Sequence, residues 1–227
     1  MSKQIRLRKG LNIHLLGDAD KVYASTKPSK KYVVKPTDFH SLNPKLCVKV
    51  GDRVKAGTLL FFDKSNEKIN FCSPVSGEII DIVRGDKRKI LEVVIQADSE
   101  ISYEEFTTAT SNNLSREQII EEMLKAGIWP FIRQKPYDII ANPSDMPKAI
   151  FISAFSSVPL AIDNDFALYG MDELFQKGLD YIIQLTNGKT YLNIDGNTNP
   201  SKVFTTVKRV EINKFSGPHP AGNVGVQ

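Results

Sequence analysis

Two different hydrophobic patterns divide this chain near residue 98. From about residue 10 to 97, short apolar or β-branched runs are separated by Gly, Pro, Asp and Asn, and no apolar helical period fills three turns. This spacing is typical of an all-β domain. The expected strands span residues 32–34, 46–50, 58–62, 69–72, 77–83 and 90–95. We therefore expect a compact barrel or sandwich over residues 1–100.

Two sequence motifs in this half are more specific than the hydrophobic pattern. In the first, Gly51-Asp52 supplies one turn and Gly57 a second, with Val54 between them predicted to point inward. The second motif runs from Ser73 to Gly77 and on into an apolar run. Together they resemble the paired hairpins of the biotinyl/lipoyl-type barrel-sandwich hybrid. The swinging-carrier function does not follow, because no lysine stands at a hairpin tip between hydrophobic neighbours.

The pattern after residue 98 alternates helices with strands. Ser115 and Gln118 form a capping box before an amphipathic helix over 116–126, which Gly127 ends. A second helix is expected over 171–186, and further strands over 149–155, 190–194 and 207–212. Strand, helix and strand in this order indicate a parallel unit. We expect an incomplete Rossmann-like α/β domain over residues 101–227, which makes the whole an α+β multi-domain chain.

Neither half carries a cofactor signature. No G-x-G-x-x-G follows the 149–155 strand, and no P-loop is present. Cys47 and Cys72 are too few for an iron-sulfur cluster and are expected to be buried free thiols. The three histidines have no ligand spacing. We expect no metal, no tightly bound cofactor and no catalytic residue in this chain.

Charge and hydropathy limit the partners. Thirty Lys and Arg against 26 Asp and Glu give 30 − 26 = +4, and both signs are interspersed, so nucleic acid is not an expected partner. The lysine-rich stretches 3–9 and 27–35 are interpreted as solvated strand edges, with an anionic-lipid or partner surface as the alternative. No run reaches the roughly 18 apolar residues of a membrane span. Because a signal peptide is also missing, a cytoplasmic location is expected.

A further motif lies near the end of the sequence. Residues 215–223 place two glycines and two prolines around His219, which predicts a rigid turn that fixes the imidazole. A stiff loop with an exposed histidine is the plainer interpretation. The sequence stops at Gln227 with no strand or helix to seal the sheet, so we expect a longer polypeptide.

Six motifs in order carry a family resemblance over essentially the whole chain. They are Lys9-Gly10-Leu11, Val50-Gly51-Asp52-x-Val54-Lys55, Ser73-Pro74-x-x-Gly77, Arg84-Gly85-x-Lys87-Arg88, Arg133-Gln134-Lys135-Pro136 and Gly217-Pro218-His219-Pro220-Ala221-Gly222. This set resembles the A subunits of sodium-translocating NADH:quinone oxidoreductases, of which it would be the N-terminal half. Residues 155–160 and 223–227 depart from the family pattern.

The resemblance implies a peripheral subunit on the cytoplasmic side of the bacterial inner membrane. The complex passes electrons from NADH to ubiquinone or menaquinone and exports sodium. Flavins and the [2Fe-2S] centre belong to partner subunits, whereas the A subunit interacts with quinone and holds no tightly bound redox cofactor. Its fold is similar to the flavoprotein subunit of respiratory complex I.

A quinone site needs an apolar wall for the ring and donors for its carbonyl oxygens. Trp129, Phe131, Arg133 and Lys135 supply both within seven residues, and His219 could donate or relay a proton. The plainer interpretation is that the two aromatic residues pack the preceding helix and that Arg133 pairs with an acid.

Two other functions remain open. The first is the C subunit of the related Rnf electron-transport complex, which would require glycine-rich flavin loops that the α/β part lacks. The second is a redox-inert docking module that joins neighbouring subunits. In isolation, the fragment is expected to catalyse nothing.

Overall fold

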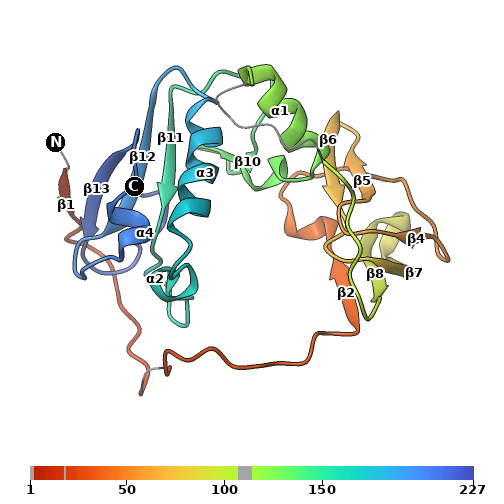
Figure 1. The fold of residues 1–227 in the computed structure, drawn as a ribbon, viewed down its shortest axis with the longest axis horizontal. Helices are drawn as coiled ribbons and strands as arrows, with labels where there is room; N and C mark the ends of the chain where they lie inside the picture. Colours follow the sequence, from red (N-terminus) through yellow and green to blue (C-terminus); the bar gives the residue numbers. More distant parts are fainter. Residues whose placement is uncertain (1–2, 18, 107–113) are drawn as a thin grey trace. The chain divides into compact units, whose positions relative to one another are not determined.

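The computed structural model describes residues 3–17, 19–106 and 114–227. The chain forms two compact units (Figure 1). The β unit spans Ser25–Asp145, and the α/β unit combines Met1–Ala24 with Met146–Gln227. The first residues of the chain therefore belong in space with the C-terminal half, although the whole β unit separates them in sequence.

Two antiparallel sheets build the β unit. One has the order β2-β8-β7-β4 and the other β3-β5-β6. The most deeply buried apolar side chains of this unit are Leu60, Phe61, Ile79, Val93 and Ile95. The strands are β2 (Lys31–Val34), β3 (Pro44–Leu46), β4 (Arg53–Val54), β5 (Leu59–Asp63), β6 (Asn66–Cys72), β7 (Gly77–Arg84) and β8 (Ile90–Ala97).

The two sequence motifs, around Gly51 and around Gly77, pair with each other as expected. The Gly51 N–H donates to the Ile79 carbonyl at 2.8 Å, and the Ile79 N–H donates to the Asp52 carbonyl at 2.9 Å. Val54 is buried between the two turns, as predicted. Gly77 lies so close to the Gln96 carbonyl that a Cβ would overlap it. The two motifs thus form the paired turns of a barrel-sandwich hybrid.

The rest of the β unit is a helix followed by a short hairpin. Ser115 and Gln118 form both bonds of the predicted capping box. Gly127 ends the helix with φ +71°, in the left-handed region that favours glycine. The elements are α1 (Arg116–Lys125), β9 (Arg133–Gln134) and β10 (Ile139–Ile140), with 3-10 helices η1 (Pro36–Asp38), η2 (Asp86–Arg88) and η4 (Trp129–Phe131).

A parallel sheet of order β1-β13-β12-β11 forms the α/β unit. Side chains of α3 and α4 pack on one face of it, where Leu192, Ile194, Val203 and Phe204 form a buried cluster. The strands are β1 (Gln4–Arg6), β11 (Ala149–Ser153), β12 (Lys189–Asp195) and β13 (Glu211–Ser216), and the helices are α2 (Asn164–Ala167), α3 (Asp172–Ile183) and α4 (Lys202–Thr205).

Three sequence expectations are wrong in detail. The strand expected over 46–50 ends at Leu46, because the chain turns where the Asp52 carboxylate accepts the Lys49 N–H at 2.9 Å. The strand expected over 207–212 starts at Glu211, because Arg209 has φ +67°. Both cysteines were expected to be buried, but Cys47 is exposed and Cys72 is half-buried. Next to Cys47, the less exposed side chains are those of Leu46 and Val48.

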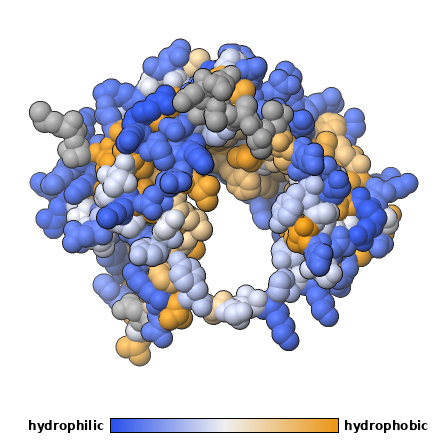
Figure 2. Space-filling model, in the orientation of Figure 1, coloured by the Kyte–Doolittle hydropathy of each residue, from blue (hydrophilic) through white to orange (hydrophobic). Residues whose placement is uncertain are grey.

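Both lysine-rich stretches lie at strand edges, as predicted. β1 and β2 are the outermost strands of their sheets. β1 is exposed throughout, and in β2 exposed residues alternate with half-buried ones. On the face shown in Figure 2, hydrophilic residues cover most of each unit. Within the described ranges, every helix is too short or too polar to cross a bilayer.

Candidate functional site

Trp129 anchors the hairpin segment of the β unit, by which we mean residues 128–141 with η4, β9 and β10. Its side chain is 3% exposed, and its indole N–H donates to the Ala141 carbonyl at 2.7 Å. The tryptophan thus ties η4 to the strand end after β10, and its only polar group is already satisfied. Trp129 supplies packing here and no free donor.

Phe131 behaves in the opposite way, although it is two residues away. It is 74% exposed, and its ring lies edge-on to Phe39 with centroids 6.2 Å apart. Ile128 and Tyr137 are also more than half exposed. Large apolar side chains facing water in one short segment indicate a contact surface.

The two cations of this segment share one acid. Lys135 Nζ lies 2.8 Å from Asp138 Oδ1, and Arg133 Nη2 lies 3.6 Å from Asp138 Oδ2. The Lys135 hydrogen bond is the largest cause of the lowered pKa of Asp138, which keeps that carboxyl ionised. Arginine carries five N–H donors, so this single contact leaves Arg133 donors for a ligand.

His219 lies in the α/β unit, on the loop after β13. Its Nδ1 is 3.0 Å from Ser157 Oγ, which also accepts the Gly222 N–H at 2.9 Å. The hydroxyl has one proton to donate, and when His219 Nδ1 accepts it, the neutral imidazole carries its own proton on Nε2, where it is a donor.

The N-terminal segment holds the same loop from the other side. Asn12 Oδ1 accepts the His219 backbone N–H at 2.7 Å, and the Leu11 N–H donates to the His219 carbonyl at 3.0 Å. Gly217 approaches the Leu7 carbonyl too closely for any side chain. The rigid turn predicted around His219 is thus held by a segment about 200 residues earlier in the chain.

These predicted site residues therefore fall in two groups. Trp129, Phe131, Arg133 and Lys135 share one segment of the β unit, whereas His219 belongs to the α/β unit. Sequence analysis did not find Ser157 and Asn12, since their link to His219 comes only from folding.

A cavity of about 540 Å³ lies at the carboxyl ends of β11 and β12. In parallel α/β sheets this is the edge at which ligands bind. One wall is the N-terminal segment, where Tyr23 stacks on Phe166 with centroids 4.5 Å apart and donates to its carbonyl. Lys21 Nζ lies 2.5 Å from Asp163 Oδ2. This hydrogen bond is the largest cause of both the raised pKa of Lys21 and the lowered pKa of Asp163.

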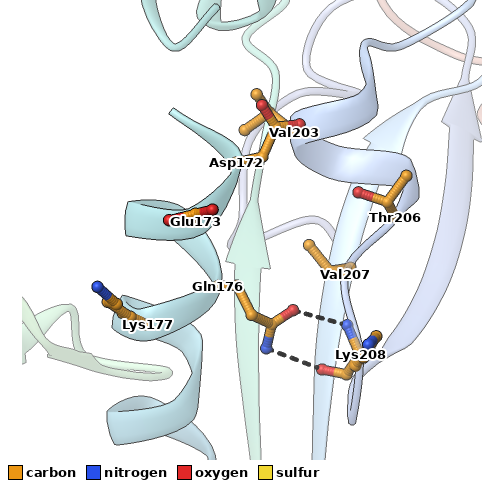
Figure 3. Close-up of a pocket in the computed structure, with 8 residues that line it drawn as sticks. All are labelled: Asp172, Glu173, Gln176, Lys177, Val203, Thr206, Val207 and Lys208. Atoms are coloured by element: carbon orange, nitrogen blue, oxygen red, sulfur yellow. Dashed lines mark hydrogen bonds between the residues drawn. The ribbon is translucent and has the colours of Figure 1, made fainter. Parts of the chain in front are cut away.

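A second groove of about 340 Å³ separates α3 from α4 (Figure 3). Gln176 bridges it by accepting the Lys208 N–H at 2.8 Å and donating to the Lys208 carbonyl at 3.4 Å. Gln176 thus fastens α3 to the chain after α4, which is a structural role.

Metal-binding side chains do not cluster in the described parts of the chain. No three of their His, Cys, Asp and Glu residues come together as ligands would.

Two family models match this chain, one in its N-terminal half and one in its C-terminal half. A model of the NqrA N-terminal barrel-sandwich hybrid domain matches residues 5–98, and a model of the NqrA second alpha/beta domain matches residues 114–227. The chain belongs to the NqrA family. The fold class expected from the sequence is confirmed, and both matches favour NqrA over the C subunit of the Rnf complex. The matched ranges lie near the expected domains 1–100 and 101–227. The division into compact units differs from them, because it places residues 1–24 in the α/β unit and residues 101–145, with α1, in the β unit.

Three curated relatives are named as the A subunit of the Na(+)-translocating NADH-quinone reductase. They come from Marinomonas sp. (strain MWYL1), Vibrio campbellii and Yersinia pseudotuberculosis, and they are 32%, 33% and 34% identical over 223 residues. Each match covers 97% of this chain and 49% of the relative. The chain thus spans about half the length of the curated relatives it matches.

Proposed function

We propose that this chain acts within the A subunit of a Na(+)-translocating NADH-quinone reductase. The observation that carries the proposal is the NqrA match of both units, together with relatives at 32–34% identity. In this role it is a peripheral subunit on the cytoplasmic side of the bacterial inner membrane. It interacts with quinone and helps to assemble the complex, while NADH, flavins and the [2Fe-2S] centre belong to partner subunits.

The quinone contact is assigned to the hairpin segment of the β unit. The exposed Phe131 ring offers an apolar face, and Trp129 holds the backbone beneath it. Arg133 and Lys135, two and four residues after Phe131, add cationic donors to the same segment. Such donors matter most as negative charge develops on a quinone oxygen during reduction. His219, with its Nε2 proton, is a candidate donor from the α/β unit.

Binding of a short-chain ubiquinone analogue to the full-length polypeptide tests this assignment. Phe131→Ala and Arg133→Gln should each raise the Kd measured by isothermal titration calorimetry at least about tenfold, which corresponds to about 1.4 kcal/mol. Tyr103→Ala is the matched control, because Tyr103 is a similarly exposed aromatic residue of the same unit outside the hairpin. Equal affinities for all three variants and the parent would refute the site.

A redox-inert docking module is the second candidate function. It is favoured by the same exposure of Ile128, Phe131 and Tyr137, since apolar side chains facing solvent also suit a protein partner. Loss of quinone binding without loss of assembly in Arg133→Gln would exclude pure docking. Failure of assembly after trimming residues 27–35 would support it.

A further inference from the structure

Large apolar side chains border the cavity at the carboxyl ends of β11 and β12. Val158, Leu160, Ile162 and Tyr169 all line it, and they are 47%, 91%, 68% and 75% exposed. The lower end of this unit in Figure 2, around α2, shows hydrophobic residues among hydrophilic ones. Single exposed apolar residues are ordinary, but four around one cavity mark an interaction surface.

The backbone itself presents one of these side chains to solvent. Leu160 has φ +60°, a conformation that residues other than glycine rarely adopt. Such a conformation persists only where the surrounding chain enforces it, and it is concentrated at binding and catalytic sites. Here it displays the most exposed side chain of the rim.

The cavity between these side chains is acidic. Its charged lining residues are Lys21, Asp163, Asp165 and Asp195, a net charge of 1 − 3 = −2, and Lys21 is already paired with Asp163. Asp165 and Asp195 each accept a backbone N–H through Oδ1, and no described residue pairs with their Oδ2 atoms. The cavity therefore attracts a cation and repels phosphate or carboxylate groups.

We propose that this surface docks a segment of another subunit, with a Lys or Arg side chain in the cavity. In the docked segment, apolar side chains on either side of that Lys or Arg cover the rim formed by Val158, Leu160, Ile162 and Tyr169 of this chain. The inference rests on the proposed function, because it requires a multi-subunit complex.

The extent of the rim favours a polypeptide over a small cation. A small ligand inside the cavity would leave Leu160 and Tyr169 facing water, whereas a chain crossing the rim buries them. Permanent interfaces between subunits are rich in such apolar contacts. Lys21 lines the cavity from the N-terminal segment and is held by its ion pair with Asp163. The Tyr23–Phe166 stack fixes the chain next to it, so this side of the surface is already formed before docking.

Site-specific photo-crosslinking in the assembled complex tests the docking surface. Full-length protein with p-benzoylphenylalanine in place of Leu160 is produced with its partner subunits, irradiated and mapped by mass spectrometry. We expect an adduct on another subunit, within a few residues of a Lys or Arg in an apolar segment. The same crosslinker in place of the exposed Lys64 should give no such adduct.

Charge variants test the acidic cavity in the same experiment. Asp165→Asn and Asp195→Asn should each lower the adduct yield at least threefold, whereas Asp86→Asn, on η2 of the β unit, should not. An adduct only within the same polypeptide or on a second copy of it overturns the inference, as does a working complex without any adduct. If no other subunit copurifies with the parent protein, the proposed function fails as well.

Discussion

The two cysteines differ in environment and should differ in reactivity. Burial raises the pKa of Cys72 to about 11, and its Sγ–H donates to the Lys125 carbonyl at 3.7 Å. At pH 8 only about one Cys72 thiol in a thousand is then the reactive thiolate. Cys47 is exposed, and its pKa is raised less.

We therefore predict that Cys47 reacts with Ellman's reagent at least about tenfold faster than Cys72 at pH 8. Cys47→Ser and Cys72→Ser separate the two absorbance time courses. The rate for Cys72 should climb about tenfold per pH unit up to pH 10, since thiolate is the nucleophile. Equal rates at pH 8 would contradict the difference in environment between the two thiols.

Single residues also show how far sequence alone could define the candidate site. Residue type and spacing were enough to single out Phe131, Arg133 and Lys135. Trp129 looked equivalent to Phe131, but its burial depends on the Ala141 carbonyl reaching its N–H. Ser157 has no local signature, because its role comes from a partner 62 residues further along the chain.

At the scale of elements, the end of α1 is specified by one glycine. Gly127 has φ +71°, and a Cβ there would lie 2.8 Å from Cys72 Sγ. Gly127→Ala combines left-handed strain with this overlap, so it should lower the free energy of unfolding by roughly 1–2 kcal/mol. Urea denaturation of the chain measures this loss.

Gly178→Ala is the matched control. Gly178 lies inside α3 with ordinary φ and with no atom within 4 Å of the added methyl group. Because alanine is the better helix former, the control should gain about 0.5–1 kcal/mol. A Gly127→Ala variant as stable as the parent would refute the assigned helix end.

The elements that sequence predicted well are those whose signals are local. The capping box and Gly127 fixed α1, and alternation fixed β7 and β8 to within two residues. Residues 3–9 were interpreted as an exposed strand edge, but the bounds of β1 were not predicted, because its three exposed residues carry no hydrophobic pattern and pair only with β13. Its pairing also explains why the N-terminal segment joins the α/β unit.

At the scale of the whole molecule, the sequence motifs were more informative than the hydrophobic pattern. The pattern gave a β half and an α/β half, which many unrelated proteins share. The six ordered motifs pointed to one family, and both family models agree with them. The structure explains several of these motifs physically, since Gly51, Gly77 and Gly217 each stand where the backbone turns or where no side chain fits.

We have proposed that this chain works in a sodium-translocating NADH-quinone reductase. The most direct test is the Na⁺-stimulated rate of NADH oxidation by quinone in membranes of the source organism. Deleting the gene that encodes this chain should abolish the Na⁺-stimulated rate, and restoring the full-length gene should bring it back. An unchanged Na⁺-stimulated rate after deletion would contradict the account.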